Sequence, residues 1–178
     1  MRNNIIGLKR GNVKLRKHNS NWRQLFKQEK ELLLKRFPDA ILEISHGGST
    51  AIPTIPAKPI IDMFAVVSSL KDTEKIRKSL EEMGYEYRGE ESVPERILYV
   101  KGKPKLRTHH LQLVERSSDE WKNHILIRDY FLKHPEIAKE YAKLKLELAK
   151  KYPNDRKSYS NGKDVFIKSI IQKAKEEN

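Results

Sequence analysis

A glycine-serine turn followed by one acidic residue is the pattern in this sequence that points most directly to chemistry. Gly48 and Ser49 precede Asp62 by twelve intervening residues, and Asp62 is the one charged residue in the apolar run 60–67. Glycine has no Cβ, so a Gly-Ser turn lets backbone N–H groups and a hydroxyl approach a phosphate closely. A carboxylate on the next strand can bind Mg²⁺, which takes carboxylate oxygens together with substrate phosphates. An ordinary turn, with an Asp that pairs with Lys58, is the competing interpretation.

Other polar residues are candidates for binding a phosphorylated ligand. Arg107 and Arg128 can bind phosphate with a bidentate guanidinium, and Lys58 and Lys163 can act as point charges. The candidate set also includes Thr50 of the turn and His110 and Gln112, which point to the same face if they lie on one strand. Because the chain has 37 Lys and Arg residues, solvated surface is the alternative for each cation.

The first half of the chain predicts strands and helices in alternation. Residues 13–18 alternate apolar and basic side chains, as in a short edge strand, and a helix follows from about residue 21 to 37. Residues 40–45 and 60–67 are predicted strands, joined by a loop that three prolines stiffen. A helix is predicted over 71–83, ending at Gly84.

The second half predicts three strands and then only helices. The strands are expected at 85–88, 96–100 and 106–114, the last two as an antiparallel hairpin, so the sheet should be mixed. Helical spacing begins at residue 117, Pro135 opens a second helix, and a third is predicted over 163–175 after a polar loop. We therefore expect one α+β domain over 1–178, with helices packed on one side of the sheet and a helical C-terminal third.

Composition limits the class of protein. The absence of cysteine excludes disulfides and thiolate metal sites, and no apolar run approaches the ~20 residues of a membrane-spanning helix. No secretion signal is visible, so we expect a cytoplasmic protein that does not bind membranes. The formal charge is +13, and residues 1–36 hold eleven Lys or Arg against two Glu. Nucleic-acid binding through this basic end is possible but not favoured, because no nucleic-acid-binding motif accompanies it.

Several multi-residue strings closely resemble the GrpB family. The core ones are EISHGGSTAIP at 43–53 and AKPIID at 57–62, and others follow in order: GYEY at 84–87, PER at 94–96, RTHHL at 107–111, RDYF at 128–131, HPE at 134–136, EY at 140–141, LK at 144–145 and GK at 162–163. The resemblance covers roughly residues 13–175. It implies a nucleotidyltransferase fold of the polymerase-β-like superfamily, in which a Gly-Ser turn precedes an acidic strand.

The resemblance also implies roles for individual residues. Gly48 and Ser49 would contact nucleotide phosphate, Ser49 and Asp62 would be catalytic, and Asp62 would bind Mg²⁺, with Glu43 as a second candidate acid. Two positions depart from the pattern. Phe64 stands where the superfamily has a second carboxylate, and Gln112 stands where the family usually has His.

Three functions remain open at this point. The first is binding of a nucleotide or phosphorylated metabolite with Mg²⁺-dependent nucleotidyl or phosphoryl transfer. The second, suggested by Phe64 and Gln112, is a binding or regulatory module that has lost catalysis. The third is nucleic-acid binding. The oligomeric state is not predicted.

Overall fold

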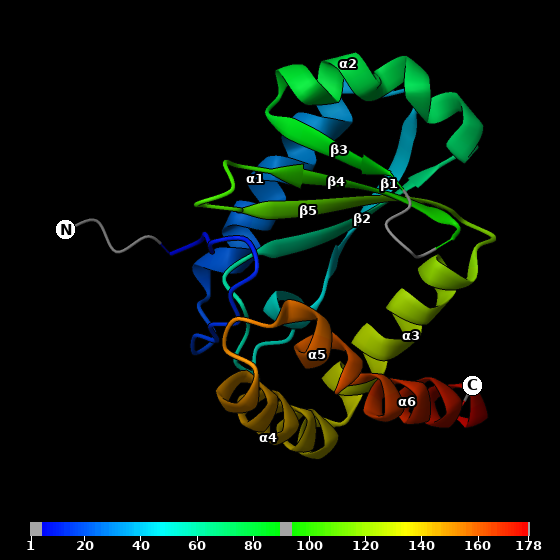
Figure 1. Cartoon of the computed structure of the whole chain (residues 1–178). Helices are drawn as coiled ribbons and strands as arrows, with labels where there is room; N and C mark the ends of the chain where they lie inside the picture. The colour runs from blue at the N-terminus through cyan, green and yellow to red at the C-terminus, as the bar shows by residue number, and fades with distance from the viewer. Residues whose placement is uncertain (1–4, 90–93, 178) are drawn as a thin grey trace.

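The computed structural model describes residues 5–89 and 94–177, so residues 1–4, 90–93 and 178 of the expected domain lie outside the described part. Five strands form one mixed sheet in the order β1-β2-β5-β4-β3 (Figure 1). The α+β class with a mixed sheet is therefore confirmed. The strands are β1 (Ile41–Gly47), β2 (Ile61–Val67), β3 (Tyr85–Gly89), β4 (Arg96–Lys101) and β5 (His109–Glu115).

The pairing of β2 brings two distant parts of the chain together. β2 runs antiparallel to β1 and parallel to β5, while β4 pairs antiparallel with both β5 and β3, which confirms the expected hairpin of β4 and β5. In the parallel register, Asp62 lies opposite His110 and Phe64 opposite Gln112. Because side chains alternate along a strand, these four residues share one face of the sheet.

The other face of the sheet is covered by α1 (Asn21–Arg36) and α2 (Glu74–Glu82). The buried aromatic and aliphatic side chains of α1, including Trp22 and Leu33, pack in one core with Met63 of β2 and Leu111 of β5. Leu80 of α2 belongs to the same core. This core explains why the 60–67 run is so apolar, since residues 61, 63, 65 and 67 of β2 are all buried in it.

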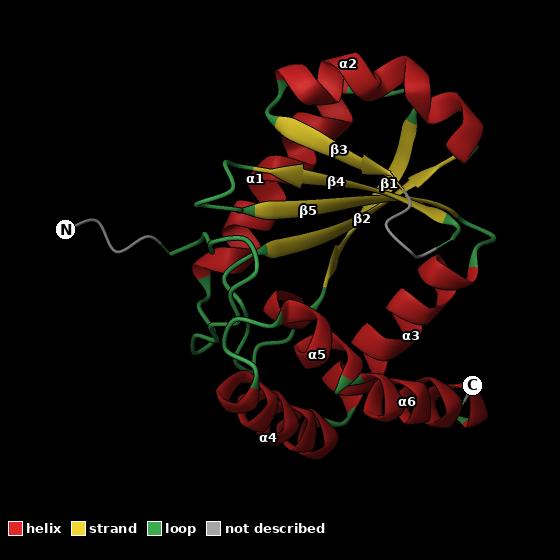
Figure 2. Cartoon of the chain, viewed as in Figure 1, coloured by secondary structure: helices red, strands yellow, loops and turns green. Residues whose placement is uncertain are grey.

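The C-terminal third is helical, as expected, and lies on the side of the sheet away from α2 (Figure 2). Phe64 and Val66, which share a face of β2 with Asp62, pack with Trp121 of this part of the chain. The C-terminal third contains α3 (Asp119–Lys133), α4 (Pro135–Lys151), α5 (Arg156–Asn161) and α6 (Asp164–Glu176). Trp121 of α3 packs on Val66 and Val114 of the sheet. A further core joins these helices to the loop after β1, where Ile52 and Ile55 are buried. Helices thus lie on both faces, α1 and α2 on one and the C-terminal helices on the other.

Two predicted segments differ from the structure. Residues 13–18 make only an isolated bridge, Arg16 to Ala57, because their backbone bonds go to loops and not to a sheet edge. The predicted polar loop after Asn154 contains the short helix α5, in which Asp155 accepts a hydrogen bond from the Ser158 N–H at 3.0 Å. Among the described residues, no helix is long and apolar enough to cross a membrane. The cytoplasmic location stays a prediction.

Candidate functional site

The glycine-serine turn lies directly against Asp62. β1 ends at Gly47, which pairs with Asp62 across the β1–β2 ladder. The next residue, Gly48, has φ 60° and ψ −169°, a conformation that is essentially restricted to glycine. A Cβ at Gly48 would lie 2.4 Å from Asp62 Oδ2, so no other residue fits without moving the carboxylate. The fold therefore places the turn and the acidic strand in van der Waals contact.

Gly48, Ser49 and Asp62 line one pocket, as the sequence hypothesis requires. The pocket has a volume of about 400 Å³ and lies between the sheet and the C-terminal helices. Three further residues expected to bind substrate, Gln112, Arg128 and Lys163, also line it. Its remaining wall contains residues that the sequence did not predict to bind substrate: Ile52, Phe64, Arg96, His124, Ile127, Phe131, Tyr141 and Ile167.

Asp62 is half-buried and paired. Its side chain is 30% exposed, and its Oδ1 lies 2.9 Å from Nδ1 of His110. Burial alone would raise the pKa of Asp62, but the hydrogen bond with His110 and the positive charge of Lys58 lower it below its usual value. The carboxylate is therefore ionised at neutral pH.

Two of the predicted cations, Lys58 and Lys163, are near enough to this carboxylate to interact with its charge. Burial lowers the pKa of Lys163 to about 8, assisted by repulsion from Lys58 and opposed by attraction to Asp62. The pKa of Lys58 is also lowered, mainly by burial, and Asp62 again opposes the shift. Both ammonium groups lie over the ring of Tyr159 in α5, at 4.5 Å from its centroid for Lys163 and 5.6 Å for Lys58.

A third lysine, Lys145, was not predicted to belong to the site. Its side chain on α4 is almost fully buried, at 2% exposure, and its Nζ lies 2.7 Å from Ser49 Oγ and 2.5 Å from the Pro56 carbonyl oxygen. Burial lowers the pKa of Lys145 to about 7, with repulsion from Lys163 and Lys58 adding to the effect. The sequence held a signal, because Lys145 falls on the apolar helical stripe four residues after Tyr141.

The contact with Lys145 orients the hydroxyl of Ser49. An ammonium group has only donors, so Lys145 donates to Ser49 Oγ and to the Pro56 carbonyl. The hydroxyl proton of Ser49 is then free to be donated to a ligand in the pocket. Ser49 thus offers a hydrogen-bond donor beside the backbone of the Gly48 turn, which suits a phosphate oxygen.

Glu43 and Thr50 lie elsewhere. Glu43 pairs with Arg116 at 2.9 Å and lines a separate pocket at the β1 edge of the sheet. Thr50 is buried, lines that same separate pocket and has its Oγ1 2.9 Å from His46 Nε2. Both expectations are therefore corrected, because neither side chain shares a pocket with Asp62. Glu43 pairs with Val66 and so lies on the same face of the sheet as Asp62, but it is four residues before Gly47 along β1 and too far from the pocket. Thr50 is directed to His46 instead.

The remaining predicted residues have protein partners. Arg107 is 5% exposed and bonds to the Gly102 carbonyl and to Glu86, and like Lys58 and His110 it lines a smaller adjoining cavity. Gln112 accepts a hydrogen bond from Arg96. Arg128 donates to Ser45 at 2.7 Å. Gln112 and Arg128 therefore line the pocket with side chains whose positions are fixed by these hydrogen bonds.

The side chains of the pocket do not fit a resident Mg²⁺ ion. No group of three Asp, Glu, His or Cys residues that could hold a metal occurs in the part of the chain that the structure describes. Phe64, at the place of the second carboxylate, is stacked on His124 with ring centroids 4.0 Å apart. One carboxylate bonded to His110 and surrounded by lysines is a poor donor set for a hard dication.

Sequence comparison identifies the family of the chain. Residues 12–173 match the family described as GrpB protein. The chain belongs to the GrpB family. It is 40% identical to the glutamate-rich protein GrpB of Alkalihalophilus pseudofirmus, over 94% of this chain and 98% of that protein. It is also 40% identical to the UPF0157 protein YqkA of Bacillus subtilis over 89% of this chain, which spans 46% of that protein.

Solved structures show the same fold in a GrpB relative. The crystal structure of the conserved protein GrpB from Enterococcus faecalis is 33% identical, with a TM-score of 0.84 over 90% of this chain and 96% of that chain. A distant likeness to the Cid1 poly(U) polymerase, at 15% identity and a TM-score of 0.47 over 83% of this chain and 49% of that chain, is too weak to bear on function.

Proposed function

We propose that the pocket beside Asp62 binds the phosphate of a nucleotide or another phosphorylated metabolite. The observation that carries this proposal is a charge imbalance. Lys58, Lys145 and Lys163 are close enough to Asp62 for its charge to oppose the lowering of each of their pKa values. Asp62 alone cannot neutralise Lys58, Lys163 and a partly protonated Lys145, and buried unpaired charge is costly. The other carboxylate that attracts Lys163 is Asp164, which is exposed to solvent. A phosphate of charge close to −2 supplies the missing negative charge.

The position of the turn supports the same ligand. The backbone at Gly48 and the hydroxyl of Ser49 form one wall of the pocket, and Lys163 forms another. Charge-assisted hydrogen bonds from such groups to phosphate oxygens are stronger than neutral ones. Phosphate would therefore lie at this end, between the turn and the start of α6.

The rest of the pocket suits an organic group. Phe64, Phe131, Tyr141 and isoleucine side chains line it, and its volume of about 400 Å³ lies in the range of small-molecule sites, roughly 300–1,000 Å³. The aromatic rings offer surfaces for stacking, as a nucleobase requires. The nucleotidyltransferase fold that membership of the GrpB family implies favours a nucleotide over other phosphorylated metabolites.

Of the three functions that the sequence left open, the side chains of the pocket favour the binding or regulatory module over metal-dependent transfer. Metal-dependent transfer in a two-metal site requires carboxylates that bracket the reacting phosphate. Here Phe64 occupies the second position and Glu43 lies in another pocket. The proposed function therefore includes no step through a metal ion.

Isothermal titration with the four ribonucleoside triphosphates tests the proposal. We expect at least one to bind, and Lys163→Met to weaken that binding by about 10- to 150-fold, since it removes a charged hydrogen bond worth roughly 1.5–3 kcal/mol. Lys168→Met is the matched control, because Lys168 lies on the same helix but is exposed and lines none of the pockets described here. Equal affinity in both variants would count against the site.

Turnover separates binding from transfer. Pyrophosphate release from a nucleoside triphosphate should stay at background in wild type and in Asp62→Asn. Release above background that disappears in Asp62→Asn would contradict the binding role and restore the transferase interpretation.

A further inference from the structure

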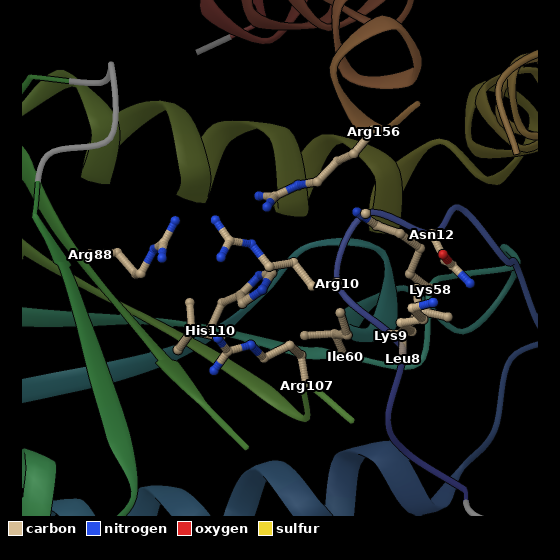
Figure 3. A pocket seen from close by; sticks show the side chains of 12 residues that line it. Leu8, Lys9, Arg10, Asn12, Lys58, Ile60, Arg88, Arg107, His110 and Arg156 are labelled. Carbon is tan, nitrogen blue, oxygen red and sulfur yellow. The ribbon is translucent and has the colours of Figure 1, made fainter. Parts of the chain in front are cut away.

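A second, smaller cavity adjoins the Asp62 pocket and is strongly basic (Figure 3). Its volume is about 40 Å³. Six of the residues that line it are Lys or Arg, and none is Asp or Glu. The lining consists of Leu8, Lys9, Arg10, Gly11, Asn12, Lys58, Ile60, Arg88, Val100, Arg107, His110 and Arg156. A cavity enriched in one charge and free of the opposite one is a place where a counter-ion is favoured.

The N-terminal wall of the cavity has a fixed position, because backbone hydrogen bonds join it to the strand ends and the loop beside them. The Leu8 N–H donates to the Arg107 carbonyl at 3.0 Å, and the Arg107 N–H returns a bond to the Leu8 carbonyl at 2.8 Å. The Arg10 N–H donates to the Pro104 carbonyl at 2.9 Å. These bonds hold the basic segment 8–12 over the ends of β2, β4 and β5. Lys9 and Arg10 of the basic N-terminal end are thereby placed on the wall of the cavity.

Like charges meet at this spot. Figure 3 shows the guanidinium groups of Arg10, Arg88 and Arg156 turned toward the same space beside His110. Glu86 pairs with Arg88 at 3.0 Å and also with Arg107, whose guanidinium is buried. No described carboxylate forms an ion pair with Arg10 or Arg156. Their repulsion costs free energy unless an anion lies between them.

We propose that this cavity is a second anion site, which binds the phosphate group of a phosphomonoester other than the ligand of the Asp62 pocket. Its size is the first reason. A water molecule needs roughly 10–15 Å³ of such space, so about 40 Å³ accommodates a group of the size of one phosphate, and the rest of a phosphomonoester would lie outside the cavity. The planar guanidinium groups of Arg10 and Arg156 match phosphate oxygens in a bidentate geometry.

The residues that line the cavity also indicate whether its phosphate belongs to a nucleic acid or to a small molecule. Apart from His110, the cavity has no aromatic side chain. Single-stranded nucleic acid is bound by aromatic surfaces on which successive bases stack. The cavity lacks them, so it suits the phosphate of a small molecule, whose remaining part extends into solvent.

One pair of hydrogen-bonded side chains, Asp62 and His110, separates the two sites. Asp62 lines the first pocket, His110 lines the second cavity, and the two are joined by a hydrogen bond of 2.9 Å. Two phosphorylated ligands would therefore bind on either side of this pair. The existence of the second site does not depend on the proposed function, but the role of its occupant as a second ligand does.

Thermal unfolding with inorganic phosphate tests the site, because a ligand that binds the folded state raises Tm with its concentration. Potassium chloride at equal ionic strength serves as the reference. We expect phosphate to raise the Tm of wild type and of Lys163→Met, in which the Asp62 pocket is weakened. Arg10→Gln and Arg156→Gln, each combined with Lys163→Met, should require about tenfold more phosphate for the same shift. Lys139→Gln, an exposed residue of α4, removes the same charge elsewhere and should behave as wild type.

The unliganded variants give a second readout. Since Arg10 and Arg156 repel their neighbours, each Gln variant should be as stable as wild type or more stable without phosphate. A structural role for these arginines would instead lower Tm in both variants at every phosphate concentration. That outcome would overturn the inference.

The result also separates the two sites. If the phosphate effect is lost in Lys163→Met but kept in Arg10→Gln, only the Asp62 pocket binds phosphate and the second site is refuted. If no nucleotide binds but phosphate still stabilises through Arg10 and Arg156, the second site holds and the proposed function fails.

Two alternative ligands test which kind of phosphorylated molecule binds to the cavity. Phenyl phosphate should replace inorganic phosphate in the Tm assay at similar concentration. A single-stranded oligonucleotide that binds equally with or without a 5′-phosphate, with affinity falling steeply as salt rises, would show backbone binding and overturn the assignment to a small phosphomonoester.

Discussion

The carboxylate of Asp62 lies so close to Gly48 that a methyl group on the glycine would be 2.4 Å from Oδ2. This contact explains why a glycine at position 48 occurs together with an aspartate at position 62. The turn needs glycine for two reasons at once, its φ of 60° and the adjacent carboxylate. A substitution at Gly48 therefore tests both requirements together.

Gly48→Ala should destabilise the fold and disturb Asp62. The backbone conformation alone costs ~1–3 kcal/mol for a residue with a Cβ, and the collision with the carboxylate adds to it. Gly84→Ala is the control, since Gly84 also has positive φ, at 87°, but no atom lies within 4 Å of the place that a methyl group would take there. Chemical denaturation should show a larger loss for Gly48→Ala. Equal losses in the two variants would mean that the contact with Asp62 carries no energy.

Lys145 should make stability depend on pH in the alkaline range. Its pKa is about 7 in the folded protein, against about 10.4 for an ordinary lysine. Between these values the unfolded chain holds a proton that the folded protein lacks, so the free energy of unfolding rises with pH, by up to ~1.4 kcal/mol per pH unit. Below the folded pKa both states hold the proton, so this dependence on pH ends there.

Lys145→Met removes the titrating group and should flatten that rise. The comparison is the pH profile of unfolding free energy from about 6.5 to 10 in both proteins, so contributions from surface groups cancel. An identical slope in wild type and Lys145→Met would show that Lys145 is protonated throughout this range.

Chelation of divalent metal should leave ligand binding intact. The pocket offers one carboxylate and three nearby lysines, so phosphate is expected to be neutralised by ammonium groups. Affinity for the bound nucleotide, measured with EDTA and with Mg²⁺, should agree within about twofold, allowing for ligand–metal association. A gain of tenfold or more with Mg²⁺ that Asp62→Asn abolishes would contradict the proposed neutralisation.

Glu29 should matter for stability but not for ligand binding. It is buried on the opposite face of the sheet, where it accepts hydrogen bonds from Tyr85 at 2.7 Å and Lys101 at 2.6 Å. Glu29→Ala leaves both donors without this partner, at a cost of about 3 kcal/mol. The exposed Glu31 on the same helix gives the control, Glu31→Ala, with little change in unfolding free energy. Loss of nucleotide affinity in Glu29→Ala at a temperature where it is folded would indicate that the two faces are coupled.

Local patterns predicted most of the elements. The apolar run 60–67 became β2 and the helical spacing after Asn21 became α1, because burial of a face at a fixed period is a local property of the sequence. The alternation at 13–18 failed as a prediction, since a strand forms only where a sheet edge is available to pair with it. The helix α5 was missed because its six residues carry little periodicity.

The sequence by itself determined the turn at Gly48 and Ser49, the acidic strand with Asp62, and the excess of positive charge, since these depend on residue types and short spacings. Only the tertiary structure decided which cations meet that carboxylate. The parallel pairing of β2 with β5 brought His110 to Asp62, and the packing of α4 buried Lys145 against Ser49. The same folding left Glu43 in another pocket. Contacts between residues 48 and 96 positions apart depend on how whole elements pack, and no local pattern records that.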